Sequence, residues 1–224
     1  KGWVVSGADS IDRVTGFDVD DLGYLYIATT VNGWTICDPQ RMQPLFQNLE
    51  VQPNKIIALR SGTQRYAFTS SGRGGVLYSV NNPANPQRVA QAAQFKDWAK
   101  TSDGGTVALI DPRNTLSINT VDRIATGRSP VAIQSGYVTV ACDGTSFYAV
   151  GAGKVDAFDA FGTFKSTFVL DPTLPNVTNI HFGDGYLATV GDNGAGVFGV
   201  RVYKTDGTPV PVTVDTSAQG FNAA

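Results

Sequence analysis

A short segment rich in strand-forming residues, with one alanine in it, recurs five times along this chain of 224 residues. The five copies read "YLYIATT", "QRYAFTS", "GTVALID", "SFYAVGA" and "GYLATVG", and their alanines are Ala28, Ala67, Ala108, Ala149 and Ala188. Successive alanines are separated by 39, 41, 41 and 39 residues. Such regular spacing predicts a structural unit of about 40 residues that is repeated along the chain.

Each copy has a Gly-bearing turn before it and three further strand-like segments around it, one before the turn and two after the copy. A unit of about 40 residues with four short strands is typical of a β-propeller blade. We therefore predict an all-β fold, a five-bladed β-propeller that forms a single domain over residues 1–224. The predicted repeats span residues 14–51, 52–93, 94–130, 131–171 and 172–216.

Three details follow from this register. The alanines are expected at one equivalent buried position per blade, where neighbouring sheets come too close for a larger side chain. The fourth strand of the third repeat is expected within "DRIATG" (122–127), and 86–100 is the one segment where a short helix competes with strand. The N-terminal "GWVVSG" (2–7) is expected to close the ring by pairing with the last blade, because an open ring leaves edge strands exposed.

The composition agrees with many strands and tight turns. The chain has 25 Gly and 11 Pro, and Glu50 is the only Glu among 19 acidic residues, the others being Asp, which favours turns and caps over helices. No apolar run approaches the roughly 20 residues of a membrane-spanning helix, so we expect no membrane insertion.

The charge is distributed unevenly along the chain. Residues 1–40 carry a net charge of −4, residues 41–128 carry +6, and residues 129–224 carry −4. This pattern favours either an anionic partner or head-to-tail self-association, and compositional drift over a solvated surface is the alternative. The candidate patch for an anionic partner consists of seven arginines from the second and third repeats: Arg60, Arg65, Arg73, Arg88, Arg113, Arg123 and Arg128.

The sequence offers little for catalysis or for cofactor binding. His181 is the only histidine, and no G-x-S-x-G motif accompanies it, so we interpret it as structural. "DVDDLG" (18–23) lacks the ligand pattern of a calcium loop and is interpreted as a turn. We expect no catalytic residue, no cofactor and no metal. Because the arginines have few aromatic residues between them, we also expect no nucleic-acid partner.

The two cysteines fall on different repeats. Cys37 lies on the predicted third strand of the first repeat, and Cys142 lies near the end of the first strand of the fourth. In a ring of five these blades are not neighbours, whereas a disulfide needs Cα atoms within about 7 Å. We expect two free thiols.

Two stretches resemble known repeat families. "RYAFTSSGRGGVLYSVNNPANPQRVAQ" (65–91) resembles the LVIVD-type propeller repeat, and "GKVDAFDAFGTFKSTF" (153–168) is similar to an NHL-type repeat. The resemblance implies a propeller of a type common in surface proteins and other binding scaffolds. It implies no shared catalytic residues.

These observations predict a non-catalytic binding or assembly module, namely an extracellular or cell-surface scaffold for protein–protein interaction or adhesion. A structural component of a virion, such as a tail or nozzle part, is one alternative. A five-bladed lectin that binds carbohydrate through aromatic residues such as Trp3, Trp34, Trp98 and Tyr186 is another. The expected partner is a protein or a second copy, and the expected location is extracellular, the cell surface or a virion.

Overall fold

The computed structural model describes residues 13–41, 43–49, 52–128 and 131–211. In this part of the chain, twenty strands form five four-stranded antiparallel sheets, accompanied by one short helix. Each sheet consists of four strands that follow one another in the sequence, so we number the sheets 1 to 5 in chain order. The all-β prediction and the prediction of five four-stranded repeats are confirmed.

The bounds of the strands follow the predicted repeats closely in sheets 1 and 2. Sheet 1 contains β1 (Val14–Val19), β2 (Leu25–Thr29), β3 (Trp34–Cys37) and β4 (Pro44–Asn48). Sheet 2 contains β5 (Lys55–Ser61), β6 (Gln64–Ser71), β7 (Gly74–Ser79) and β8 (Gln87–Ala92).

The remaining three sheets have the same strand order. Sheet 3 contains β9 (Asp97–Lys100), β10 (Thr106–Ile110), β11 (Thr115–Thr120) and β12 (Ala132–Ser135). Sheet 4 contains β13 (Thr139–Cys142), β14 (Ser146–Gly151), β15 (Lys154–Asp159) and β16 (Phe164–Val169). Sheet 5 contains β17 (Asn176–Gly183), β18 (Tyr186–Asp192), β19 (Phe198–Lys204) and the short β20 (Pro209–Val210).

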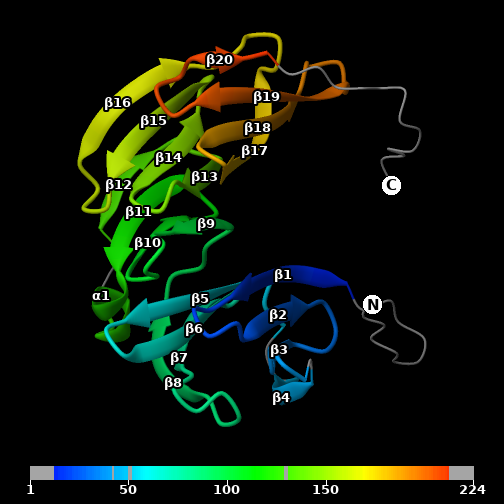
Figure 1. The fold of residues 1–224 in the computed structure, drawn as a ribbon, viewed down its shortest axis with the longest axis vertical. Coiled ribbons are helices and arrows are strands. Elements are labelled where there is room, and N and C mark those ends of the chain that lie inside the picture. The colour runs from blue at the N-terminus through cyan, green and yellow to red at the C-terminus, as the bar shows by residue number, and fades with distance from the viewer. Residues whose placement is uncertain (1–12, 42, 50–51, 129–130, 212–224) are drawn as a thin grey trace.

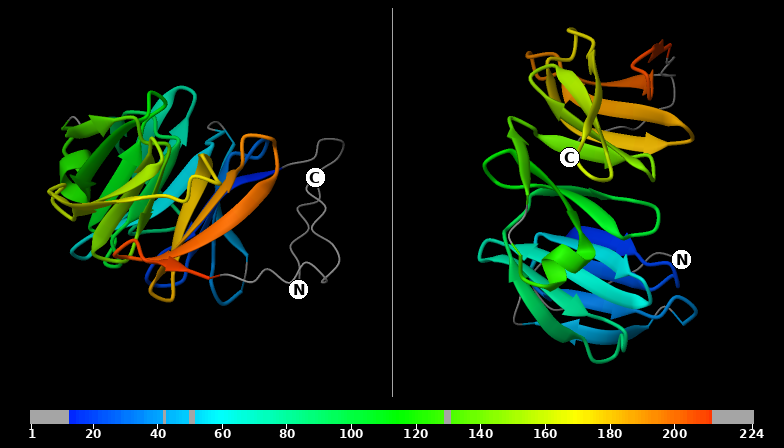
Figure 2. Two further views of the ribbon diagram at one scale, coloured as in Figure 1. Left: turned by 90° about the horizontal axis from the view of Figure 1, so that it is seen from above. Right: turned by 90° about the vertical axis from the view of Figure 1, so that its left-hand side faces the viewer.

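The five sheets lie side by side along an arc that stays open between sheet 5 and sheet 1 (Figures 1 and 2). The first strand of each sheet lies on the inside of the arc and the fourth strand on the outside (Figure 1). The segment expected to close the ring, residues 2–7, lies outside the described residues. In the described part of the chain, the blades are therefore arranged as in a propeller, but the ring is open.

Each pair of consecutive sheets encloses one hydrophobic cluster. Tyr26 and Trp34 of sheet 1 pack against Tyr78 of sheet 2, and the Trp34 and Tyr78 ring centroids lie 4.9 Å apart. Three similar clusters join sheets 2 and 3, 3 and 4, and 4 and 5. A sheet between two neighbours buries both faces, which is why every residue of β14 is buried and why its sequence is a nearly continuous apolar run.

Helix α1 (Val121–Ala125) replaces the strand that was predicted at 122–127. Thr120 caps this helix by accepting a hydrogen bond from the Arg123 backbone N–H, and Val121 and Ile124 turn inward onto the cluster between sheets 2 and 3. The fourth strand of sheet 3 is β12 instead, so the third unit extends to Ser135 and the predicted boundary at residue 130 is wrong. The segment 86–100 forms β8 and β9 and contains no helix.

The five repeat alanines all lie on the second strand of their sheets, but they do not share a face. Ala28 and Ala108 pack toward the next sheet, whereas Ala67 and Ala149 pack toward the preceding one. Ala188 is only half-buried, because no sheet formed by the described residues packs on its side of sheet 5. The prediction of one equivalent position is therefore wrong, since a shift of one residue along a strand moves a side chain to the opposite face.

A close approach between sheets occurs at the first strands. A Cβ added at Gly16 on β1 would lie 3.3 Å from the Cα of Lys55 on β5. Glycine at this position lets the inner strands of sheets 1 and 2 approach closely.

Candidate functional site at the inner channel and the open end

The first strands of all five sheets line a channel on the inside of the arc. It contains a cavity of about 560 Å³, bordered by residues of β1, β5, β9, β13 and β17. Charged and polar side chains reach it from several sheets, among them Lys55, Asp97, Lys100 and His181. Each first strand pairs with its sheet on one side only, so its other edge carries backbone groups that need partners.

Polar side chains connect the first strands of consecutive sheets. Asp18 accepts a hydrogen bond at 2.8 Å from the backbone N–H of Ala58 in sheet 2. The Asp97 carboxylate accepts a hydrogen bond at 2.9 Å from the backbone N–H of Val140 in sheet 4. The Thr139 hydroxyl oxygen accepts one at 3.3 Å from the backbone N–H of Ile180 in sheet 5. We call Asp18, Asp97 and Thr139 the latch residues, because each ties its own sheet to the next.

The latch residues occupy one structural position that exists in every sheet. Each is paired across the strands with a second-strand residue that faces the next sheet. By the same pairing the position holds Ile57 in sheet 2, opposite Phe68, and Asn179 in sheet 5, opposite Val190. The five latch positions, Asp18, Ile57, Asp97, Thr139 and Asn179, lie 39, 40, 42 and 40 residues apart, so they mark the true register of the repeat.

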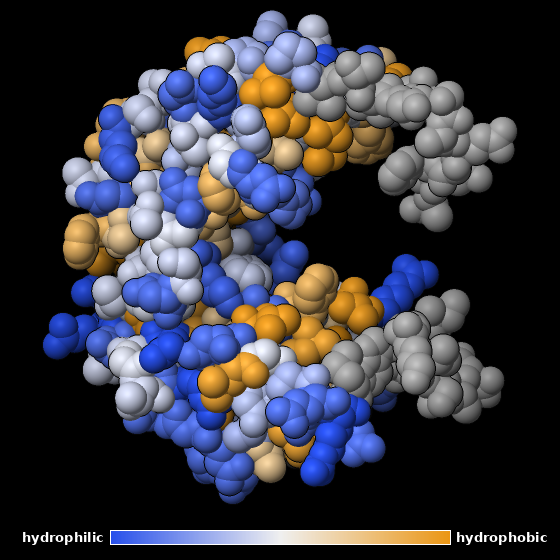
Figure 3. Space-filling view, viewed as in Figure 1, coloured by the Kyte–Doolittle hydropathy of each residue, from blue (hydrophilic) through white to orange (hydrophobic). Residues whose placement is uncertain are grey.

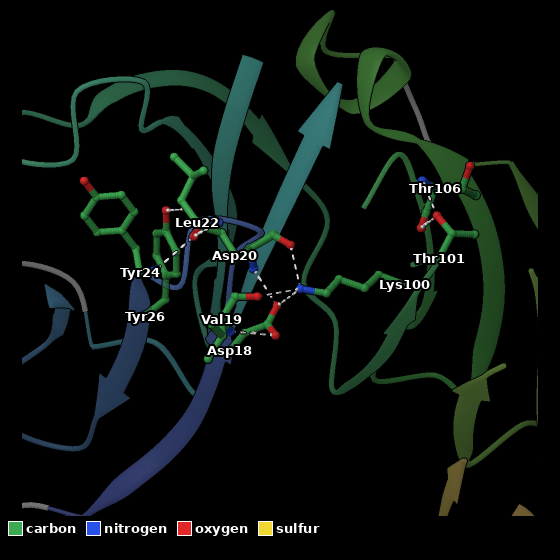
Figure 4. A network of polar contacts seen from close by, with 10 residues as sticks. Asp18, Val19, Asp20, Leu22, Tyr24, Tyr26, Lys100, Thr101 and Thr106 are labelled. Atoms are coloured by element: carbon green, nitrogen blue, oxygen red, sulfur yellow. Dashed lines mark hydrogen bonds and ion pairs between the residues drawn. The ribbon is translucent and has the colours of Figure 1, made fainter. Parts of the chain in front are cut away.

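Lys100 on β9 is the hub of a polar network that crosses the channel (Figure 4). Its ammonium group lies 2.5 Å from the Asp18 carboxylate and donates to the backbone carbonyls of Val19 and Ala58, at 3.3 and 3.0 Å. Its charge also lies 5.9 Å from the centre of the Trp98 ring. One side chain of sheet 3 therefore binds sheets 1 and 2 together.

The "DVDDLG" segment is a turn whose carboxylates are engaged by the protein itself. Asp20 Oδ1 accepts from the backbone N–H groups of Leu22 and Tyr24, and its Oδ2 accepts from the Tyr26 hydroxyl (Figure 4). Burial, reinforced by the Asp20 charge, raises the pKa of Tyr26 well above its usual range. These contacts support the interpretation of the segment as a structural turn.

At the open end, two apolar faces have no sheet of the described part of the chain packed against them. On sheet 1, the face turned away from sheet 2 carries Phe17, Val19, Leu25 and Ile27, with Phe17 66% exposed. We call it the sheet-1 open face. Hydrophobic side chains gather on both sides of the opening in the space-filling view (Figure 3).

The second uncovered face lies on sheet 5, turned away from sheet 4. Register places Val190 opposite Val200, Ala188 opposite Val202, and Tyr186 opposite Lys204 on this face, which we call the sheet-5 open face. Val200 on the third strand of sheet 5 is 39% exposed, whereas the corresponding third-strand residue of sheet 4, Val155, is fully buried.

The seven arginines do not form one continuous patch. Arg60 and Arg65 pair with acidic residues of sheet 1, Arg60 with Asp21 at 2.5 Å and Arg65 with Asp20 at 3.5 Å. Part of the basic segment is thus neutralised across the boundary between sheets 1 and 2. The other five lie apart: Arg73 and Arg88 border a surface hollow on sheet 2, Arg123 and Arg128 border another beside α1, and Arg113 lies in the turn between β10 and β11.

The other candidate residues lie in unrelated places. His181 is exposed on β17 beside the channel. Trp34 is buried in the cluster between sheets 1 and 2, Tyr186 lies on the sheet-5 open face, and Trp3 lies outside the described residues. Among the residues that the structure describes, no group of three His, Cys, Asp or Glu side chains is placed to hold a metal ion.

Both cysteines are free thiols. Cys37 is buried on β3, and Cys142 is half-buried at the end of β13, so they belong to sheets 1 and 4, which are not neighbours. Burial raises the pKa of both thiols, and that of Cys142 rises to about 11.

Comparison with known proteins supports the fold and leaves the function open. No protein-family model and no curated protein matches this sequence. A solved structure titled "Kuenenia stuttgartiensis Hydrazine Synthase" is similar with a TM-score of 0.63 and 15% sequence identity, over 91% of this chain and 67% of that one. At this identity the similarity concerns the β-propeller-like architecture alone. None of the helices in the described ranges is long and apolar enough to cross a membrane.

Proposed function

We propose that this chain is a non-catalytic binding or assembly module that acts through the open end of its arc. The observation that carries the proposal is the pair of open faces, where exposed Phe17 and Val200 stand on sheets that elsewhere bury such side chains. Exposed apolar surface that is contiguous on a sheet is typical of an interaction site. The polar groups of the channel are used mainly in ties between sheets, which supports a scaffold better than an enzyme.

The setting we propose is extracellular, at a cell surface or in a virion. The resemblance of residues 65–91 to the LVIVD-type repeat supports a surface scaffold for protein–protein interaction or adhesion. A tail or nozzle component of a virion would use the same faces against neighbouring subunits. In both settings the partner is a protein surface that covers the apolar faces.

The test compares the native chain with Phe17→Ser/Val200→Ser in its native source, after separation into secreted, envelope and particle fractions. Phe161→Ser is the matched control, because Phe161 is 90% exposed in the turn before β16, away from the open end. We expect the native chain and the control to sediment with a larger assembly and the double variant to sediment alone. The five-bladed lectin would be supported instead if the native chain, the control and the double variant all sediment alike and bind the same glycans on an array.

A further inference from the structure

We propose that the occupant of the open end is a second copy of this chain, docked head to tail so that sheet 1 of one copy packs on sheet 5 of the other. This deepens the proposed function and rests on it. We call the face that a sheet turns toward the following sheet its forward face, and the opposite face its backward face. Within the described part of the chain, each of the four interfaces joins the forward face of one sheet to the backward face of the next. The open faces are the one forward face and the one backward face left over among the described residues, so a second copy continues the interface that the chain already uses four times.

The latch register gives this interface a specific polar contact. Asn179 holds the latch position of sheet 5 and is exposed, and its amide oxygen can accept a hydrogen bond as the Thr139 hydroxyl does. In sheets 2, 4 and 5, the N–H group that a latch residue binds belongs to the residue directly after the latch position: Ala58, Val140 and Ile180. Asn179 is therefore expected to accept from the equivalent N–H group of the second copy's sheet 1.

In sheet 1 that equivalent group is the N–H of Val19. It is bonded at 2.9 Å to Oδ1 of the neighbouring Asp18, an exposed local contact, whereas Asp18 Oδ2 serves as the latch to sheet 2. Docking would exchange this local bond for one to Asn179 and leave the latch of Asp18 intact. Val19 is itself on the sheet-1 open face, so its backbone and side chain would be covered together.

A second copy brings a complete four-stranded sheet with the required face, as each neighbouring sheet does within the chain. Because the contact joins two different faces, it can be repeated to give a closed ring or a filament.

The test uses the full chain and two charge insertions, Phe17→Arg on sheet 1 and Val200→Arg on sheet 5. Both side chains are exposed in the single copy, so each variant should keep its fold, which far-ultraviolet circular dichroism checks. Light scattering after size exclusion should show dimers or larger species for the native chain, increasing with concentration. Each variant alone should be monomeric, and an equimolar mixture should form one-to-one dimers, because the two intact faces then belong to different chains.

A finer pair of variants tests the latch. Asn179→Ala should weaken association about three- to tenfold, as expected for one lost hydrogen bond, and Asn179→Asp should retain an acceptor and lose less. A monomeric native chain at all concentrations would overturn the inference, as would self-association of Phe17→Arg alone, which would mean a symmetric contact between two sheet-5 faces. A monomeric native chain whose assembly in the native source still depends on Phe17 and Val200 would overturn the second copy as occupant and leave the proposed function standing.

Discussion

Replacement of Asp18 should destabilise the fold far more than replacement of the neighbouring Asp21, although both carboxylates are paired with a basic residue. Asp18 is 13% exposed and its partner Lys100 is 22% exposed, whereas Asp21 and Arg60 are 42% and 44% exposed. Asp18 also accepts the backbone N–H of Ala58, which is itself buried.

The magnitude follows from the contacts that each substitution removes. Besides an exposed local bond from the Val19 N–H, Asp18→Ala removes two hydrogen bonds between sheets to a charged acceptor, worth about 1.5–3 kcal/mol each, and leaves a buried amide without that acceptor. Allowing for the partial exposure of Lys100, we expect a loss of about 3–5 kcal/mol in the free energy of unfolding. Asp18→Asn keeps an oxygen for Ala58 but loses the ion pair, so it should cost about 1–2 kcal/mol. Asp21→Ala removes an exposed pair and should cost about 0–1 kcal/mol.

Equilibrium unfolding in urea, followed by tryptophan fluorescence, measures all three variants, and Trp98 beside Lys100 provides a local signal. A double-mutant cycle with Lys100→Met separates the ion pair from the bond to Ala58. If Asp18→Ala destabilises the protein no more than Asp21→Ala does, the tie between sheets contributes nothing and the reasoning from burial is refuted.

Three further predictions concern packing, thiols and pH. Ala108→Phe should cost about 1–3 kcal/mol because Ala108 is fully buried between sheets 3 and 4, whereas Ala188→Phe on the sheet-5 open face should cost under about 1 kcal/mol, both measured by urea unfolding at concentrations where the chain is monomeric. Thiol titration of the denatured, unreduced protein should find two free groups. In the folded protein, Cys142 has a pKa of about 11, so its alkylation should be slow at pH 8 and faster as the pH approaches 11. A hydrogen bond from Arg201 lowers the pKa of Asp171 from 3.8 to about 2. The ionised carboxylate should therefore stabilise the fold above about pH 4 and lose that contribution as the pH falls toward 2. Asp171→Asn should flatten this part of the curve of stability against pH.

The number of sheets and their strands could be predicted from the sequence because sheets stacked on both sides produce apolar runs between glycine turns. The exact register could not, since the position that repeats structurally holds Asp18, Ile57, Asp97, Thr139 and Asn179. The five latch residues occupy equivalent structural positions but have different side chains. The five alanines have the same side chain but lie on different faces of their sheets. Spacing of 39 to 42 residues was the one signal that could have revealed the latch position.

The open end and the pairing of the arginines depend on how the sheets are placed in space. Closure of the ring by residues 2–7 stays a prediction, because these residues lie outside the described part of the chain. Whether the last sheet approaches the first depends on the angle between successive sheets, which no local sequence pattern gives. Likewise Arg60 and Asp21 lie 39 residues apart in the chain and meet only because sheets 1 and 2 stack. Net charge by segment therefore overstated the basic character of the second repeat.

Lys100 changes how the arc should come apart. In an array where each unit touches only its neighbours, the end units have a single interface and open first. Lys100 ties sheet 1 to sheet 3 across sheet 2, so the N-terminal end is held by more than its one neighbour. Among the described residues, sheet 5 is joined to sheet 4 by one hydrophobic cluster and by the bond from the Ile180 N–H to Thr139, so opening should begin there. Backbone amides of β18 should exchange with solvent sooner than those of β10, although both are central strands of equivalent sheets.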